Sequence, residues 1–282
     1  MPEPALLSHR TIISVSGADA ETFLSGLLTA SVSGMAPAEL RYGALLTPQG
    51  KIIADMLIAN EDGAFLIDCD SGVSANFLKR LNMFRLRAKV VIEERADLCA
   101  IAFDGAPDPR SELAPRRRIG PRNDASASTD APHDAGEYHA HRIAAGLAEQ
   151  GIDFAPEDVF PADINMDLVG GIDFKKGCFV GQEVVSRMKR RGNARRRTLV
   201  VDLESDASTP TPILAAGLEI GKLTSVQGRK GLARVRIDEI EDANKWMEGH
   251  LPDGSRVTFE KPAWLADELK AMWQAKQAKK TQ

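Results

Sequence analysis

The first hundred residues alternate between the hydrophobic period of strands and that of helices. Apolar and polar positions alternate weakly over residues 9–15, which predicts a strand, and residues 20–28 carry their apolar side chains on one helix face. The stretches 42–47 and 51–59 are both strand-like, and the link between them, residues 48–50, consists of turn-forming types. The pattern therefore predicts a core helix after the first strand, followed by a β-hairpin.

The alternation continues as far as residue 93. A turn at residues 61–63 precedes a third strand at 64–68, residues 73–87 have the apolar spacing of a helix, and residues 89–93 are again strand-like. The order strand, helix, strands, helix, strand is typical of an α+β layer. We therefore expect an antiparallel sheet with helices on one face.

The composition changes after a further predicted strand at residues 98–103. The segment 104–136 contains five prolines, many Asp, Ala and Ser residues, and almost no large apolar side chain. Such a segment buries too little surface to offset its ordering entropy, so we expect a flexible loop inside the domain. The three arginines at 116–118 are expected to be solvated in this loop, with contact to an anionic partner as the alternative.

The C-terminal part predicts a small barrel and a final helix. Short strand-like stretches at 198–203, 218–223, 231–237 and 256–259 are separated by Pro, Gly and Asp links, which is the pattern of a small β-barrel. Residues 263–280 form an amphipathic pattern that we expect to dock onto the body as a helix. The predicted division is 1–193 for the first domain, 194–262 for the barrel and 263–282 for the terminal helix.

The composition narrows the class of protein. The 282 residues are 43% hydrophobic and 27% charged with a net charge of -4, which predicts no general affinity for nucleic acid. No basic flank with an apolar signal core opens the chain, and no apolar run approaches the ~20 residues of a membrane span, so we expect a cytoplasmic protein. The three cysteines, Cys69, Cys99 and Cys178, are too far apart to indicate a disulfide framework or a metal site. An iron–sulfur cluster could not be held by this chain alone.

Residues 175–183 concentrate more reactive groups than any other stretch. Two lysines, Cys178, two glycines, an amide and a carboxylate run directly into a segment with helical apolar spacing. Gly181 suits a tight turn before that helix, and the neighbouring cations Lys175 and Lys176 favour a thiolate, although Glu183 opposes part of this field. The alternative is a buried structural cysteine, the usual position of this residue.

The same stretch carries a family resemblance. Residues 176–183, with the sequence KGCFVGQE, resemble the signature K-G-C-[YF]-x-G-Q-E of the YgfZ family. These proteins are relatives of the glycine-cleavage T-protein, and their mitochondrial members serve iron–sulfur cluster assembly. The resemblance extends to 141–146, 161–167 and 170–174, and more weakly to 23–29 and 47–51.

The resemblance implies a T-protein-like fold that binds a reduced folate, such as tetrahydrofolate, in a central cavity. Asp163 and Asn165 are then expected to meet the pterin ring, while Arg142 and Arg187 meet its glutamate tail. Structural salt bridges are the alternative for the two arginines. Asp55, Gln182 and Glu183 complete the predicted folate-binding set. Met166, Phe174 and Phe179 are expected at the faces of the ring, with packing in the core as the alternative.

One departure from the T-protein pattern bears on catalysis. T-proteins have the pattern G-G-x-x-D-D, with two adjacent aspartates, in the second hairpin strand. This chain has Ala54 before Asp55, so one of the two carboxylates is missing. Cys178 and Lys176 are therefore the candidate reactive groups, and enzymatic turnover is uncertain.

Three functions remain open. The leading hypothesis is a folate-binding auxiliary factor for assembly or repair of iron–sulfur enzymes, including those that modify tRNA, with iron–sulfur enzymes or assembly proteins as partners. The alternatives are a tetrahydrofolate-dependent aminomethyltransferase and an RNA-binding module that uses the basic run 189–197. That run lacks interleaved aromatic residues and is more typical of a pocket mouth or a solvated surface.

Overall fold

A five-stranded antiparallel sheet forms the centre of the computed structural model, which describes residues 2–61, 63–123, 134–191, 194–237, 248–265, 267, 269 and 270. The strand order is β3-β4-β5-β2-β6. The bounds are β2 Arg10–Ser16, β3 Leu40–Leu46, β4 Ile52–Glu61, β5 Ala64–Asp70 and β6 Val91–Glu94. The predicted hairpin, its third strand and the α+β class are thus confirmed.

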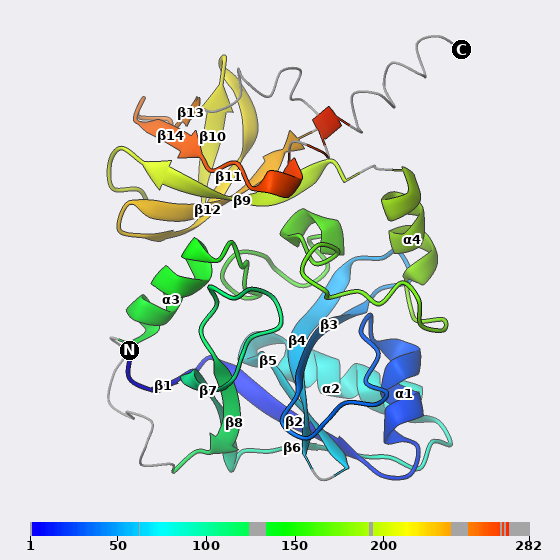
Figure 1. Cartoon of the computed structure of the whole chain (residues 1–282). Coiled ribbons are helices and arrows are strands. Elements are labelled where there is room, and N and C mark those ends of the chain that lie inside the picture. Colours follow the sequence, from blue (N-terminus) through cyan, green and yellow to red (C-terminus); the bar gives the residue numbers. More distant parts are fainter. Residues whose placement is uncertain are drawn as a thin grey trace, which may run out of the picture.

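Two helices cover one face of this sheet, as Figure 1 shows. They are α1, Ala20–Leu27, and α2, Ser71–Arg85. Each helix buries the apolar side chains that its sequence spaces three and four residues apart, and Phe77 and Leu81 of α2 are completely buried. Asp70 caps α2 through a 2.9 Å hydrogen bond that its carboxylate accepts from the Gly72 N–H. The other face of the sheet packs against the long connection between α3 and α4.

A second, smaller sheet corrects the prediction of a flexible loop at 104–136. Its order is β1-β7-β8, with β1 Ala5–Leu6, β7 Leu98–Ala106 and β8 Arg117–Pro121. Arg117, expected to be solvated, is instead buried, and its guanidinium lies 2.7 Å from the Asp68 carboxylate. This ion pair joins β8 to β5 of the five-stranded sheet, a contact that the apolar composition of the segment does not indicate. Residues 124–133 of the predicted loop lie outside the described part of the chain, and α3, Asp134–Ala144, follows them.

The C-terminal part is a closed barrel with the order β10-β11-β12-β9-β14-β13. The bounds are β9 Arg196–Leu203, β10 Thr211–Ala215, β11 Leu218–Gln227, β12 Lys230–Arg236, β13 Glu248–His250 and β14 Arg256–Phe259. The predicted barrel is confirmed, although β10 and β13 were missed. Pro212 interrupts the strand pattern of β10, and β13 is only three residues long.

The connection between body and barrel contains the 3-10 helix η1, Pro161–Ile164, and the helix α4, Gln182–Arg191. In Figure 1 the barrel lies above the body, with α3 and α4 on either side of the connection. Of the predicted terminal helix, residues 263–265 are helical, and most of the remainder lies outside the described residues. No helix in the described part of the chain has the length and apolarity needed to cross a membrane.

Buried polar contacts join the barrel to the body. The Arg142 guanidinium of α3 lies 2.7 Å from the Asp153 carboxylate and donates to the Ser225 hydroxyl of β11 at 2.8 Å. The Asn165 amide donates to the Thr198 carbonyl at 2.7 Å. Because these groups come from both parts and are buried, body and barrel share one polar seam.

Candidate functional site

The KGCFVGQE loop is anchored to the end of α1 by a lysine. The Lys176 ammonium donates to the backbone carbonyls of Ser25, Leu28 and Ala30 at 2.5, 2.6 and 3.1 Å. The carboxylate of Asp173 accepts hydrogen bonds from the backbone N–H groups of residues 175 and 176, which holds the start of the loop in a turn. Lys176 therefore fastens the loop to the sheet-covering helix.

Two further residues fix the other end of the loop. Phe179 is buried in the core on the far side of the sheet from α1 and α2. Gly181 has a φ of +80°, and a Cβ on it would lie 2.7 Å from the Thr47 carbonyl in the turn between β3 and β4. Only glycine fits such a left-handed position at that distance. The loop is therefore held at both ends.

Cys178 lies exposed between these anchors, whereas Cys69 and Cys99 are buried. Burial raises the pKa of the Cys69 thiol to about 12, which makes it unreactive at neutral pH. The alternative of a buried structural cysteine at 178 is thus excluded by its exposure. Of the three thiols, the one in the motif is available to a partner or ligand.

The position of Lys176 favours a structural role over the predicted catalytic one. Its ammonium points to three carbonyl groups at the end of α1, and burial lowers its pKa to about 8 although Asp173 opposes this shift. It also lies 5.1 Å from the centre of the Phe179 ring. A direct action on the Cys178 thiol stays a prediction.

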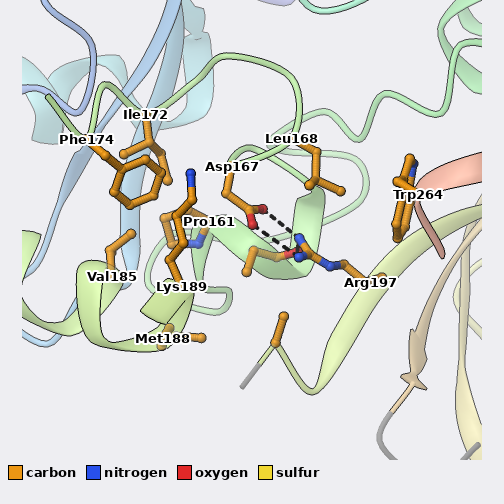
Figure 2. A pocket seen from close by; sticks show the side chains of 12 residues that line it. Pro161, Asp167, Leu168, Ile172, Phe174, Val185, Met188, Lys189, Arg197 and Trp264 are labelled. Atoms are coloured by element: carbon orange, nitrogen blue, oxygen red, sulfur yellow. Dashed lines mark hydrogen bonds and ion pairs between the residues drawn. The ribbon is translucent and has the colours of Figure 1, made fainter. Parts of the chain in front are cut away.

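An apolar cavity of about 230 Å³ lies next to this loop, between η1, α4 and the barrel. Figure 2 shows Phe174 and Trp264 on opposite sides of it, with the ion pair of Asp167 and Arg197 between them. The lining residues are Pro161, Ala162, Asp167, Leu168, Ile172, Phe174, Val185, Met188, Lys189, Ala194, Arg197 and Trp264. Cys178 is not among them.

The charges of the cavity are positioned by aromatic and carboxylate partners. The Arg197 guanidinium makes two hydrogen bonds to Asp167, at 2.6 and 3.1 Å, and lies 5.7 Å from the Trp264 ring centre. The Lys189 ammonium lies 3.8 Å from the centre of the Phe174 ring. Aromatic faces, aliphatic walls and two cations together suit a flat heterocycle that carries an anionic tail.

The predicted ring contacts Asp163 and Asn165 lie in or next to η1, both buried. The Asp163 carboxylate accepts the Phe160 N–H at 2.9 Å, and burial raises its pKa. The Asn165 amide nitrogen is used by Thr198, while its Oδ1 is buried without a hydrogen-bond partner. Neither residue lines the cavity of Figure 2.

The predicted tail contacts are separated by the fold. Arg142 is buried in the polar seam and lies 3.2 Å from Glu149 as well as 2.7 Å from Asp153, which favours the salt-bridge alternative. Arg187 is exposed on α4, so it alone of the two faces solvent. Gln182 and Glu183 begin α4 and are half-buried and exposed, respectively. Their predicted folate contacts stay predictions.

Asp55 lies at the centre of the body. Its Oδ2 accepts the Tyr42 hydroxyl at 2.8 Å, its Oδ1 is buried without a partner, and burial raises the pKa of its carboxyl. Arg110 lies over the Tyr42 ring at 5.1 Å and makes a 2.7 Å ion pair with Asp108. The segment before β8, which contains Arg110, therefore covers one side of the Asp55–Tyr42 pair.

Sequence reasoning missed two residues that bring a charge or an aromatic ring to the cavity, Asp167 and Trp264. Phe174 was predicted for a ring face and does line it. The prediction that the basic run 189–197 lines a pocket mouth is supported for Lys189 and Arg197. Their signal in the sequence was the position of this run directly after the motif helix.

Family models match two parts of the chain. Residues 7–114 match the GCVT N-terminal domain, and residues 195–267 match the CAF17 C-terminal β-barrel domain. The second match begins one residue before β9. Both assignments agree with the sheets and the barrel described above.

A solved structure and curated relatives extend these matches to most of the chain. The glycine cleavage system aminomethyltransferase T from Bartonella henselae superimposes with a TM-score of 0.73 over 94% of this chain and 86% of its own, at 15% identity. This likeness shows the fold. The iron–sulfur cluster assembly factor IBA57 homologue of Mycosarcoma maydis, named mitochondrial, is 31% identical over 74% of this chain, which spans 59% of that relative's length.

A second relative is covered more completely. The mitochondrial IBA57 homologue of Pyricularia oryzae is 32% identical, over 84% of this chain and 72% of the relative. The resemblance to YgfZ is confirmed at the coarser level of a GcvT-like protein related to iron–sulfur assembly factors. The chain belongs to the IBA57 family.

Proposed function

We propose that this protein is an iron–sulfur cluster assembly factor in which Cys178 makes the contact with the cluster or with its client enzyme. The observation that carries the proposal is one exposed thiol on a loop fixed at both ends, by Lys176 and by Gly181. Relatives at 31 and 32% identity are named as iron–sulfur cluster assembly factors. A fixed, exposed thiol can reach a partner without local unfolding.

Cys178 alone supplies too few ligands for an iron–sulfur cluster, so the proposal requires a partner that supplies the others. Iron–sulfur clusters are commonly held by four cysteine thiolates. Two of the three thiols of this chain, Cys69 and Cys99, are buried in the body and lie apart from the motif. Within the described residues, no cluster of His, Cys, Asp and Glu side chains forms a metal site. A cluster that Cys178 touches must therefore take its remaining ligands from another protein, which makes this chain one half of a transfer complex.

A reduced folate is the small molecule that the cavity of Figure 2 fits best. At about 230 Å³ the cavity is smaller than the roughly 300–1,000 Å³ of a drug-sized ligand pocket, so it holds a bicyclic ring and leaves the tail outside. Trp264 would contact one face of the ring on its side of the Asp167–Arg197 pair, while Lys189, on the Phe174 side, would meet the anionic tail. Bound folate would supply a carrier for one-carbon units close to the motif helix.

Asp55 does not line this cavity, and its carboxylate is enclosed beside Tyr42 in the body. Its unpartnered Oδ1 is a buried acceptor, so the folate contact that the resemblance implies for Asp55 is not part of the ring site proposed for the cavity. Because Ala54 replaces the second carboxylate, aminomethyl transfer is the less favoured alternative.

RNA binding is also less favoured. Two of the cations that the RNA hypothesis needs, Lys189 and Arg197, are engaged with Phe174 and Asp167 inside the cavity. Phosphate contacts require cations that are free to approach a strand. Iron–sulfur enzymes, including those that modify tRNA, are therefore the proposed clients rather than RNA itself.

The test of the thiol uses a deletion strain complemented with variants. We expect Cys178→Ser to melt at the wild-type temperature and to fail to restore the activity of iron–sulfur enzymes, tRNA-modifying ones included. Lys175→Ala, a change at an exposed lysine three residues away, is the matched control and should restore activity. Full restoration by Cys178→Ser would remove the thiol from the mechanism. Fractionation of the same strain tests the predicted cytoplasmic location.

The test of the cavity uses calorimetry with tetrahydrofolate. We expect micromolar affinity, on the order of -8 kcal/mol. Trp264→Ala should weaken binding by about 1–3 kcal/mol because a stacked aromatic face is lost. Lys175→Met, outside the cavity, should bind as the wild type does. The absence of any binding heat and of any thermal shift would contradict the folate part of the proposal.

A further inference from the structure

The end of α2 carries large apolar side chains in solvent. Met83, Phe84 and Leu86 are 67%, 41% and 89% exposed, and Val91, at the start of β6, is 51% exposed. We call these four residues the α2-end patch. Single exposed apolar residues are common on protein surfaces, but four within nine positions mark a contact surface.

The patch arises because the apolar face of α2 extends beyond the core. Val73, Phe77 and Leu81 are buried against the sheet at helical spacing. Phe84, three residues after Leu81, continues the same face but has no core to enter. Residues 82–87 are all exposed, so the last turn of the helix contributes nothing to the body.

Leu86 has a backbone conformation that is unfavourable for a residue with a side chain. It is the residue that ends α2, and its φ is +42°, a region in which glycine is favoured. Its side chain gains no burial in return, being 89% exposed. Among the residues that the structure describes, none covers the Leu86 side chain, as expected for a residue that contacts another molecule.

The charge around the patch specifies what that molecule carries. Residues 71–92 contain five cations, Lys79, Arg80, Arg85, Arg87 and Lys89, and no acidic residue, in a chain whose net charge is -4. The acidic groups that adjoin them are Asp19, which accepts the Lys89 N–H, and Glu93 and Glu94 of β6, so cations are in excess around the patch. Only Arg80 has an ion-pair partner in the described part of the chain, Glu157 at 2.8 Å. An apolar centre with a basic rim is complementary to an apolar segment flanked by Asp and Glu.

The patch and the Cys178 loop are connected through α1. At one end of this helix the Asp19 carboxylate accepts the Lys89 N–H at 2.7 Å, next to the patch. At the other end the Lys176 ammonium binds the carbonyls of Ser25 and Leu28. An eight-residue helix is ~12 Å long. Figure 1 shows α1 between the loop before α4 and the chain that leaves α2.

We propose that the α2-end patch docks an acidic protein that exchanges an iron–sulfur cluster at Cys178. This inference rests on the proposed function, because it names the partner of the same thiol. A typical interface of about 800 Å² per partner is roughly 30 Å across, which is wide enough to include both ends of α1. Apolar contacts at the patch hold the partner, and its cluster faces the fixed loop.

The test selects ligands for the full-length protein from a displayed library of random short peptides. We expect the selected peptides to combine Asp and Glu with Leu or Phe, and their binding to weaken as salt rises. Leu86→Gly together with Met83→Ser should weaken their binding at least tenfold. Leu113→Gly, at a leucine that is 67% exposed in the turn before β8, is the matched control and should bind them fully.

Folding defects are separated from docking defects by thermal melting. Leu86→Gly alone should melt above the wild type, since it relieves the positive φ, and should still lose peptide binding. In the deletion strain it should lower iron–sulfur enzyme activity while the alkylation rate of Cys178 stays at the wild-type value. This combination is not produced by a misfolded variant.

Each opposing result overturns the inference. Selected peptides that are not acidic, or that bind Leu86→Gly as well as the wild type, exclude an acidic partner at the patch. Binding to vesicles of anionic lipid without peptide binding would identify a membrane as the occupant, and a dimer lost in Phe84→Ser would identify a second copy. Cys178→Ser should keep its peptide binding, so restored client activity in that variant refutes the proposed function separately.

Discussion

Lys176 offers the sharpest test of how the motif loop is built. Its side chain joins the loop to the end of α1 through three backbone carbonyls. Replacing it by methionine keeps the aliphatic stem and removes all three hydrogen bonds. Lys175→Met removes a neighbouring cation that is exposed, and so serves as the control.

The magnitude follows from two opposing effects. A hydrogen bond to a charged group contributes about 1.5–3 kcal/mol, and three bonds from one ammonium contribute less than three times that amount. Burial disfavours the charge, which is why the pKa of Lys176 falls to about 8. The cost of burying the ammonium offsets part of the gain, and we expect Lys176→Met to lower the free energy of unfolding by about 2 kcal/mol.

Urea unfolding at neutral pH measures this difference. We expect the midpoint of Lys176→Met to fall at an unchanged slope, and Lys175→Met to stay within about 0.5 kcal/mol of the wild type. Alkylation of Cys178 should become faster in Lys176→Met if the loop is loosened. Wild-type stability combined with a large drop in the alkylation rate would refute this reasoning, because it would show that Lys176 acts on the thiol.

Three further outcomes follow from the described contacts. Gly181→Ala should destabilise by about 2 kcal/mol or more on urea unfolding, since its φ is +80° and a Cβ meets a backbone carbonyl, whereas Gly177→Ala, with open space around it, should be neutral. Arg142→Met should cost about 3 kcal/mol because Asp153 loses its cationic partner and Glu149 loses one of its cations, and Arg187→Met, on the surface, should change stability little. Because the folded pKa of Lys176 lies below its unfolded value, the folded state binds fewer protons from about pH 8 to the ordinary lysine value of 10.5; the urea midpoint of the wild type should therefore rise across this window relative to Lys176→Met.

Most of the fold could be predicted from the sequence because the apolar residues of the body recur at the spacing of strands or of helices. Apolar alternation located β2 to β6, and helical spacing located α1 and α2. Strand β8 was not predicted because its first residue, Arg117, is held in the structure by an ion pair with Asp68 and not by apolar contacts. Pairing between residues 49 positions apart leaves no trace in a local pattern.

The site was harder to predict because its parts come from separate elements. The motif indicated a functional rather than a buried Cys178, which is exposed, and Phe174 lines a cavity, although its contact with a pterin stays a prediction. Trp264 escaped because it follows the barrel and meets η1 and α4 only in the folded chain. The sequence could not distinguish the two expectations for Arg142, a contact with the folate tail or a salt bridge. An arginine near a motif looks the same in the sequence whether it binds a ligand or, as here, two carboxylates.

The polar seam between body and barrel has a consequence for dissecting the molecule. A fragment that begins at residue 195 would contain Ser225 and Arg197 without Arg142 and Asp167, their partners in the other half. The complementary fragment would keep the Asp167 carboxylate and the Arg142 guanidinium, which would face water on the surface that the barrel covers in the intact protein. Cutting the chain at the boundary of the family model therefore replaces buried ion pairs and hydrogen bonds by contacts with water, and the arrangement of the two halves is preserved only in a single polypeptide.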